Sequence, residues 1–236
     1  MIILAIDSSG MTASCAVATE DRVLAEFNVN NKKTHSQTLL PMIDTLKNIL
    51  ELNINDIDVI AVSKGPGSFT GLRIGSATAK GIALAIDKPI IEISSLEAMA
   101  YQIFAADAVI CPMMDARREQ VYTGIFAYED GVFKRLSEDR PLAVTDIIDE
   151  INKIGRKTIF LGDGIPVYKN IIKEGVRVPY LFAPVFENRQ RAAALAGLAF
   201  EYAQKGLYTD PDMHRPEYLR LSQAERERLN KMGKLK

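Results

Sequence analysis

The sequence predicts an α/β protein whose two halves repeat one order of strands and helices. Each half opens with β-rich runs joined by short turns and continues with alternating helices and strands. Asp7 and Asp115 end the first predicted strand of their halves, and the glycine turns at 65–67 and 162–164 lie at corresponding places further on. This correspondence indicates an internal duplication.

In the first half, apolar runs predict strands, and the long stretch after the Gly-Pro-Gly turn, which has no helix breaker other than glycine, predicts a helix. The turn "ATEDRV" at 18–23 joins two strands as a hairpin would. The Gly-Pro-Gly turn at 65–67 separates a strand from a long helix. The predicted elements are strands 2–6, 13–19 and 23–29, helix 37–50, strand 57–62, helix 70–86, strand 89–93 and helix 95–104.

The second half follows the same order after a boundary near residues 104–107. The predicted elements are strands 108–113, 120–127 and 132–134, helix 145–154, strand 158–161, a helix after the turn 162–164 and a last helix at 189–204. Three antiparallel strands followed by alternating helices and strands, twice over, is the plan of the duplicated actin-like or ribonuclease-H-like (ASKHA) fold, with two βββαβα-type halves. Two unrelated α+β halves are the alternative.

We therefore expect an N-terminal half at 1–104 and a C-terminal half at 105–236, with helix 95–104 as a candidate hinge. We expect the last helix and the tail to return to the N-terminal half. The charged ending "SQAERERLNKMGKLK" has no core face and is expected to be frayed or to depend on a partner.

Composition limits the classes of function. Apolar residues make up 47% and charged residues 25% of the 236 residues, which is typical of a soluble globular protein. The net charge of −1 gives no overall electrostatic attraction for nucleic acid. Cys15 and Cys111 lie in apolar runs and are expected to be reduced. No segment resembles a signal peptide or a membrane span, so we expect a cytoplasmic protein.

A phosphate-binding loop is the chemistry that the glycine turns suggest, because a helix N-terminus after a tight turn presents free N–H groups. In active actin-like proteins the first-strand aspartate holds Mg²⁺, and Asp7 has that place here. The candidate residues are Asp7, Ser8, Ser9, Thr12, Gly65 and Gly67. A small phosphotransferase or ATPase that uses Asp7 is therefore one hypothesis. A strand-end aspartate that caps a turn is the other.

Several expected features of such an enzyme are missing from the sequence. Ser9 stands where phosphotransferases have a glycine, and no Gly-Gly pair is present to hold adenosine. His35 and His214 have no partner at metal-ligand spacing, so we expect no metal site. No Gly-x-Ser-x-Gly elbow supports a peptidase. Arg117 or Arg118 could bind a phosphate, although a solvated hairpin explains "DARREQVY" better.

Two predicted helices have more apolar surface than one sheet would cover. On helix 70–86, one stripe can pack on the sheet, while a second, with small residues that permit close approach, lies nearly opposite. Either another part of the chain or a partner covers this second face. The predicted association surface consists of Leu39, Met42 and Leu46 of the first helix and Ile74, Ala77, Gly81 and Leu84 of the second.

Seven segments together resemble the TsaB (YeaZ) family, in family order and over residues 2 to about 225. They are "IDSSGMTASCAV", "HSQTLLPMI", "SKGPGSFTGLRIG", "ISSLEAMA", "MDARREQVY", "FLGDGIPVY" and "RPEYLRLSQAE". The most specific of them is "GPGSFTGLRIG". The paired histidines of the paralogue TsaD have no match, and His35 alone opens the segment where that helix would lie.

The resemblance implies a non-catalytic subunit of the bacterial machinery for tRNA threonylcarbamoyladenosine. In that family the subunit pairs with TsaD through a helical bundle, and the ATPase TsaE joins the complex. The complex transfers threonylcarbamoyl from its adenylate to N6 of the adenosine beside the anticodon. We expect no bound cofactor of the chain's own, with ATP or ADP at the complex interface. A homodimer is expected without TsaD, and tRNA contact only through the complex.

Overall fold

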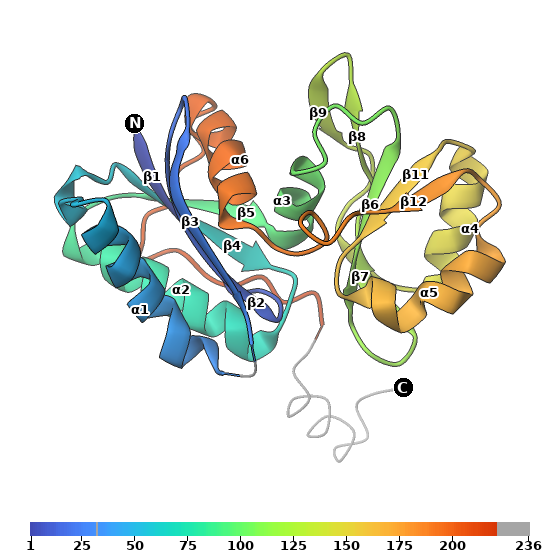
Figure 1. Cartoon of the computed structure of the whole chain (residues 1–236), viewed down its shortest axis with the longest axis horizontal. Coiled ribbons are helices and arrows are strands. Elements are labelled where there is room, and N and C mark those ends of the chain that lie inside the picture. Colours follow the sequence, from blue (N-terminus) through green and yellow to red (C-terminus); the bar gives the residue numbers. More distant parts are fainter. Residues whose placement is uncertain (32, 221–236) are drawn as a thin grey trace.

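Two β-sheets lie side by side in the computed structural model, which describes residues 1–31 and 33–220 (Figure 1). The first sheet has the strand order β3-β2-β1-β4-β5. Its strands are β1 (Ile2–Asp7), β2 (Thr12–Thr19), β3 (Val23–Asn30), β4 (Val59–Gly65) and β5 (Ile90–Ser94). The first three are antiparallel, because short turns join them, whereas β4 and β5 run parallel to β1 after helical crossovers.

Helices cover both faces of the first sheet. α1 (His35–Ile49) and α2 (Phe69–Ala85) pack on one face, and α6 (Ala192–Gln204) packs on the other. Alternate residues of β1 supply the two cores, since Leu4 and Ile6 face α1 and α2 while Ile3 and Ala5 face α6. The short 3-10 helix η1 (Ile54–Asp56) leads into β4. α6 thus returns from the end of the second half to the first sheet.

The second sheet repeats the order of the first along the path β10-β7-β6-β11-β12. Its strands are β6 (Val109–Asp115), β7 (Gln120–Thr123), β8 (Phe126–Glu129), β9 (Val132–Arg135), β10 (Arg140–Ala143), β11 (Thr158–Leu161) and β12 (Tyr180–Phe182). Here too the first strand lies between an antiparallel and a parallel neighbour. The duplicated actin-like fold predicted from the sequence is confirmed.

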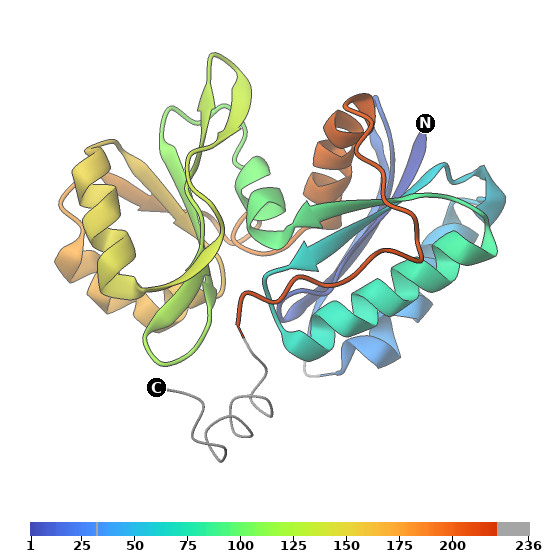
Figure 2. The same ribbon diagram turned by 180° about the vertical axis from the view of Figure 1, so that it is seen from behind.

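The second sheet is also covered on both faces. α4 (Val144–Ile154) and α5 (Gly164–Gly175) pack on the outer face. α3 (Ser95–Tyr101) lies between the two halves, where it contacts β6 as well as α6 and the strands β4 and β5 (Figure 2). Ser94 caps α3 by accepting hydrogen bonds from the N–H groups of Leu96 and Glu97. Both halves therefore meet at this short helix.

The single strand predicted at 120–127 is wrong, because the ladder is interrupted between β7 and β8. Thr123 pairs with Met113, and Phe126 pairs with Ile110, so the register is the same on both sides of the break. Pro112 lies opposite the break and has no N–H to donate, while its carbonyl accepts a hydrogen bond from the Thr123 hydroxyl at 2.9 Å. One proline thus divides one predicted strand into two.

Other differences concern short or terminal segments. β10 and β12, which are only four and three residues long, were not predicted from the sequence. The last helix begins at Ala192, three residues later than predicted, and α3 ends three residues earlier, at Tyr101. The charged ending at 222–236 lies outside the described residues. In the part of the chain that is described, no helix combines the length and apolar composition needed to cross a bilayer.

Candidate functional site

A cleft of about 740 Å³ lies between the two halves, at the carboxyl ends of β1, β4 and β6. This edge of an α/β sheet is where ligands usually bind. Its walls are the β1–β2 turn, the start of α1, the first turns of α2, the loop after β6 and residues 217–220. Of the predicted loop residues, Ser9 and Gly67 line the cleft, whereas Asp7, Ser8 and Thr12 are buried behind it.

The two predicted phosphate loops pack directly on each other. A Cβ atom added to Gly67 would lie 2.2 Å from the Ser9 carbonyl oxygen, and one added to Gly71 would lie 2.1 Å from that of Ser8. The Ser68 N–H donates to the Ser9 carbonyl at 2.7 Å, and the Ser8 hydroxyl donates to the Gly71 carbonyl at 2.8 Å. These glycines therefore serve close packing. Several polar groups of the loops bond within the chain, whereas Asp7 Oδ2 and Thr12 Oγ1 are buried without a hydrogen-bond partner.

Asp7 is only 1% exposed and is held by the loop that follows it. Its Oδ1 accepts hydrogen bonds from the N–H and the hydroxyl of Ser9, at 2.8 and 2.7 Å. Burial raises the pKa of Asp7 to about 6, because the cost of desolvating the carboxylate exceeds the stabilisation that these bonds give it. The arrangement is that of an aspartate that organises a turn inside the protein.

We expect the Asp7→Asn substitution to remove a pH dependence of stability. Asp7 binds its proton more tightly in the folded chain, so the free energy of unfolding falls as the pH rises from 3.8 to about 6. The loss amounts to about 3 kcal/mol and is complete above that range. Asparagine keeps the Oδ1 acceptor and carries no charge. Urea titrations at pH 4 and pH 7.5 should therefore show a flatter pH profile for the variant, and an unchanged profile would contradict the raised pKa.

The corresponding aspartate of the second half is also used within the chain. Asp115 Oδ1 accepts from the Tyr168 hydroxyl and from the Arg117 N–H, both at 2.8 Å. Asp163, at the second glycine turn, accepts from the Asp115 N–H at 3.0 Å, and burial raises its pKa. Gly65 and Gly162 both have positive φ angles, of 120° and 110°. The two halves thus keep matching loops, and both loops bind their own neighbours.

Sequence reasoning missed a polar contact that joins three distant segments. His214 is buried, with Nε2 2.8 Å from the Ser76 hydroxyl of α2 and Nδ1 bonded to the Glu92 carboxylate of β5. The order Ser–His–Glu is that of a hydrolase triad. However, Ser76 is 4% exposed and lies within a helix, so no substrate can reach it. Bonding to His214 lowers the pKa of Glu92, and the set fastens residue 214 to the first half.

The predicted association surface needs a correction. Leu39, Met42 and Leu46 are buried between α1 and the first sheet, so they cannot contact a second chain. The wide apolar arc of α1 is explained by packing within the half. Exposed apolar residues of α1 are instead Leu40 and Ile49.

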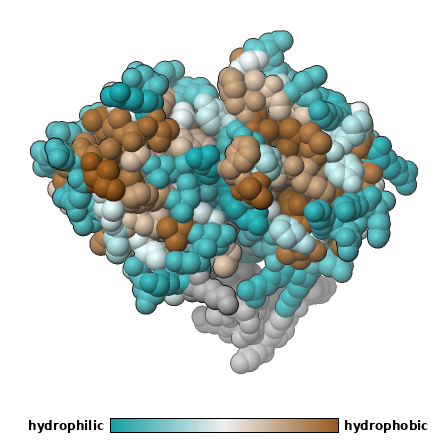
Figure 3. Space-filling view, in the orientation of Figure 1, coloured by the Kyte–Doolittle hydropathy of each residue, from teal (hydrophilic) through white to brown (hydrophobic). Residues whose placement is uncertain are grey.

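The second predicted stripe does reach the surface of α2. Ala77 and Gly81 are exposed, Leu84 is 52% exposed and Ile74 is half-buried. A Cβ atom added to Gly81 would meet nothing within 4 Å. Figure 3, in the orientation of Figure 1, shows that apolar side chains also reach the surface of both halves. Binding of a partner by Ile74, Ala77, Gly81 and Leu84 stays a prediction.

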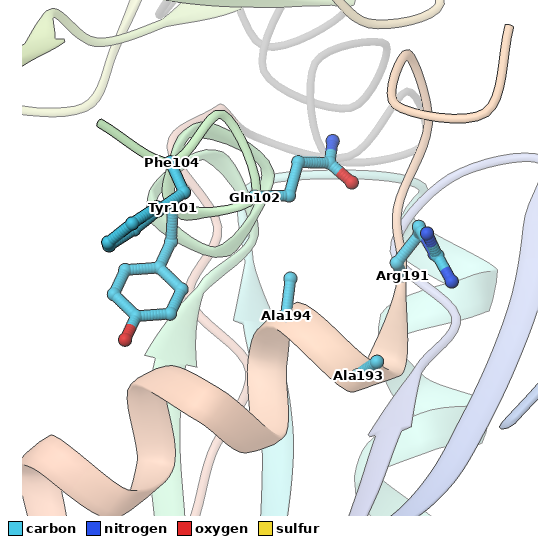
Figure 4. Close-up of a pocket in the computed structure, with 6 residues that line it drawn as sticks. All are labelled: Tyr101, Gln102, Phe104, Arg191, Ala193 and Ala194. Atoms are coloured by element: carbon cyan, nitrogen blue, oxygen red, sulfur yellow. The ribbon is translucent and has the colours of Figure 1, made fainter. Parts of the chain in front are cut away.

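A second, smaller cavity of about 270 Å³ lies between the end of α3 and the start of α6 (Figure 4). Aromatic rings and alanines form much of its wall, with Tyr101, Phe104, Ala193 and Ala194 among them. Its charged residue, Arg191, is already paired with Glu26 of β3. The cavity is therefore lined mainly by apolar and aromatic side chains and has few polar groups that could bind a ligand. Across residues 1–31 and 33–220, no group of three or more His, Cys, Asp or Glu side chains could hold a metal ion.

Two halves of this kind, with matching loops after their first strands, define a class, that of duplicated actin-like proteins. Comparison with known proteins agrees with this class. The family model described as TsaD, tRNA N6-adenosine threonylcarbamoyltransferase, matches residues 22–227. A solved structure titled (R)-2-hydroxyglutaryl-CoA dehydratase component A, from Acidaminococcus fermentans, shares the fold at 12% identity, with a TM-score of 0.51 over 86% of this chain and 99% of that one.

Two further relatives are similar over nearly their whole length. The tRNA threonylcarbamoyladenosine biosynthesis protein TsaB of Bacillus subtilis is 36% identical over 227 residues, which is 95% of this chain and 96% of that protein. The structure of YeaZ from Pseudomonas aeruginosa is 25% identical, with a TM-score of 0.76 over 92% of this chain and 99% of that one. The chain therefore belongs to the TsaB (YeaZ) family.

Proposed function

We propose that this protein acts in the biosynthesis of threonylcarbamoyladenosine in tRNA, as a non-catalytic subunit that pairs with TsaD. Family membership supports the pathway. One structural observation supports the lack of catalysis by this subunit. The β1–β2 loop and the first turns of α2 bond to each other and pack closely, which leaves little room between them for a phosphate.

The alternative is an active phosphotransferase with Asp7 as a Mg²⁺ ligand. Both loops would have to separate before Asp7 could reach the cleft, because its carboxylate is buried and bonded to Ser9. In this proposal TsaD supplies the active site, TsaE joins the pair, and ATP or ADP binds at the interface of the complex. The balance of 29 basic and 30 acidic residues favours tRNA contact through the complex.

Reconstitution with TsaD and TsaE from the same organism tests the proposal. Without this chain, we expect formation of threonylcarbamoyladenosine in tRNA to fall by about two orders of magnitude or more, the size of effect expected when a catalytic site is not correctly assembled. Alone, the chain should show neither transfer nor ATP hydrolysis. Metal-dependent turnover by the isolated chain that disappears in Asp7→Asn would favour the phosphotransferase instead.

A further inference from the structure

The chain after α6 follows the first half and ends at the cleft. We refer to residues 208–220 as the strap; it extends beside α2 and β5 and reaches the space between the halves (Figure 2). Its start adds one antiparallel bridge to β5, because Thr209 and Ile90 exchange two backbone hydrogen bonds of 2.7 and 2.9 Å. The buried His214, bonded to Ser76 and Glu92, fixes its middle.

The end of the strap lies on the glycine turn after β4. The Glu217 N–H donates to the Lys64 carbonyl at 2.7 Å, and the side chains of the two residues form an ion pair at 3.0 Å. A Cβ atom added to Gly65 would lie 2.5 Å from the Glu217 carbonyl oxygen. The backbone of the strap therefore rests on the turn, at a place where a side chain at position 65 would exclude it.

Tyr218 and Arg220 extend the strap across the cleft. The Tyr218 ring packs on Phe69 with 4.5 Å between ring centroids, and its hydroxyl accepts a hydrogen bond from Arg73 at 3.1 Å. Arg220 Nη1 donates to the carbonyl of Ala116, in the loop after β6, at 2.7 Å. Both residues line the cleft. The strap thus joins the first half to the second on the cleft side.

The two halves are also joined at α3. Arg135 of β9 forms ion pairs with Glu97 of α3 and with Asp139, and the Tyr128 hydroxyl of β8 donates to the Tyr101 carbonyl at 2.8 Å. These contacts and the Arg220 contact lie on different elements of the second half. The contacts at α3 can therefore serve as a pivot while the Arg220 contact is made or broken.

The loop that receives Arg220 has a strained backbone. Residues 117, 118 and 119 have φ angles of 62°, 56° and 57°, and none of them is glycine. Left-handed conformations of this kind are unfavourable in residues other than glycine. Such a loop relaxes to another conformation when the contacts that hold it are removed.

We propose that the strap is a latch that keeps the cleft closed, with α3 as the pivot. Tyr218 secures the latch to the first half, and Arg220 engages the second half through the strained loop. Release of these two residues lets the halves separate about α3 and exposes the glycine turn. The inference concerns the chain by itself and does not depend on the proposed function.

Hydrogen exchange on the full chain tests the latch, with Arg220→Ala, Tyr218→Ala and a matched control. The control is Arg215→Ala, since Arg215 Nη1 donates its hydrogen bonds within the strap, to the carbonyls of Asp212 and His214. We expect amides at 116–120 to exchange about tenfold faster in both latch variants, and those at 64–70 to follow in Tyr218→Ala. β1 and β6 should keep their protection, which shows that the fold is intact.

Distances between spin labels separate opening of the halves from local loosening of the loop. The labels are attached to cysteines that replace Asn48 of α1 and Asn170 of α5, which are exposed and lie on opposite halves. The native Cys15 and Cys111 are buried and do not compete for the label. We expect a longer and broader distance distribution in Arg220→Ala than in the wild-type chain and in Arg215→Ala. Equal distributions in all three proteins, or equal exchange at 116–120, would overturn the latch.

Discussion

Gly71→Ala is expected to destabilise the protein by about 2 to 3 kcal/mol, although alanine is the better helix former. The added methyl group would lie 2.1 Å from the backbone oxygen of Ser8, which cannot rotate away as a side chain would. Either α2 or the β1–β2 loop must shift, and the bond from the Ser8 hydroxyl to the Gly71 carbonyl would be strained or lost. Urea denaturation of the isolated chain measures the effect.

Gly81→Ala in the same helix is the matched control. Position 81 is exposed and has no atom within 4 Å of an added Cβ, so the substitution should stabilise the protein by about 0.5 to 1 kcal/mol. The two variants change the same residue type in one helix and are expected to differ in sign. Equal effects at both positions would show that Gly71 does not serve packing against Ser8.

The order of elements was predictable because local signals mark it. Apolar runs followed by polar or glycine turns identify the strands β1, β4, β6 and β11. The matching places of Asp7 and Asp115 indicate the duplication. β10 and β12 were missed, because Pro141 obscures one and the other is three residues long. Such short strands form because they pair with a neighbouring strand, and the local sequence does not show which strand that will be.

The candidate site was predictable only in part, for the same reason. Asp7 and Gly67 were recognised as loop residues, but their side-by-side packing depends on contacts across about sixty positions of the chain. The set of His214, Ser76 and Glu92 joins residues separated by 122 and 138 positions. No spacing rule identifies it. Helical periodicity also marked α1 as apolar over a wide arc without showing that its own sheet covers Leu39 and Leu46.

Gly81→Glu and Ala77→Arg are expected to weaken binding of TsaD by at least about 100-fold while the chain stays folded. This prediction rests on the proposed pairing. Both positions are exposed on α2 and carry side chains no larger than a methyl group, so a partner helix can approach closely there. A charge placed in that contact would lose its water without gaining a partner. Calorimetric titration with TsaD measures the loss.

Stability and affinity should move independently in these variants, which distinguishes an interface from a core. Replacing an exposed helical glycine with glutamate removes the helix cost of glycine, so Gly81→Glu should unfold at the same urea concentration as the wild type or a higher one. Val167→Arg is the control, because Val167 is 58% exposed on α5 of the other half, comparable to Leu84 at 52%. We expect it to bind TsaD normally. Normal binding by both α2 variants would place the interface elsewhere. Loss of binding by Val167→Arg would show that the interface is not confined to α2, because Val167 lies on α5.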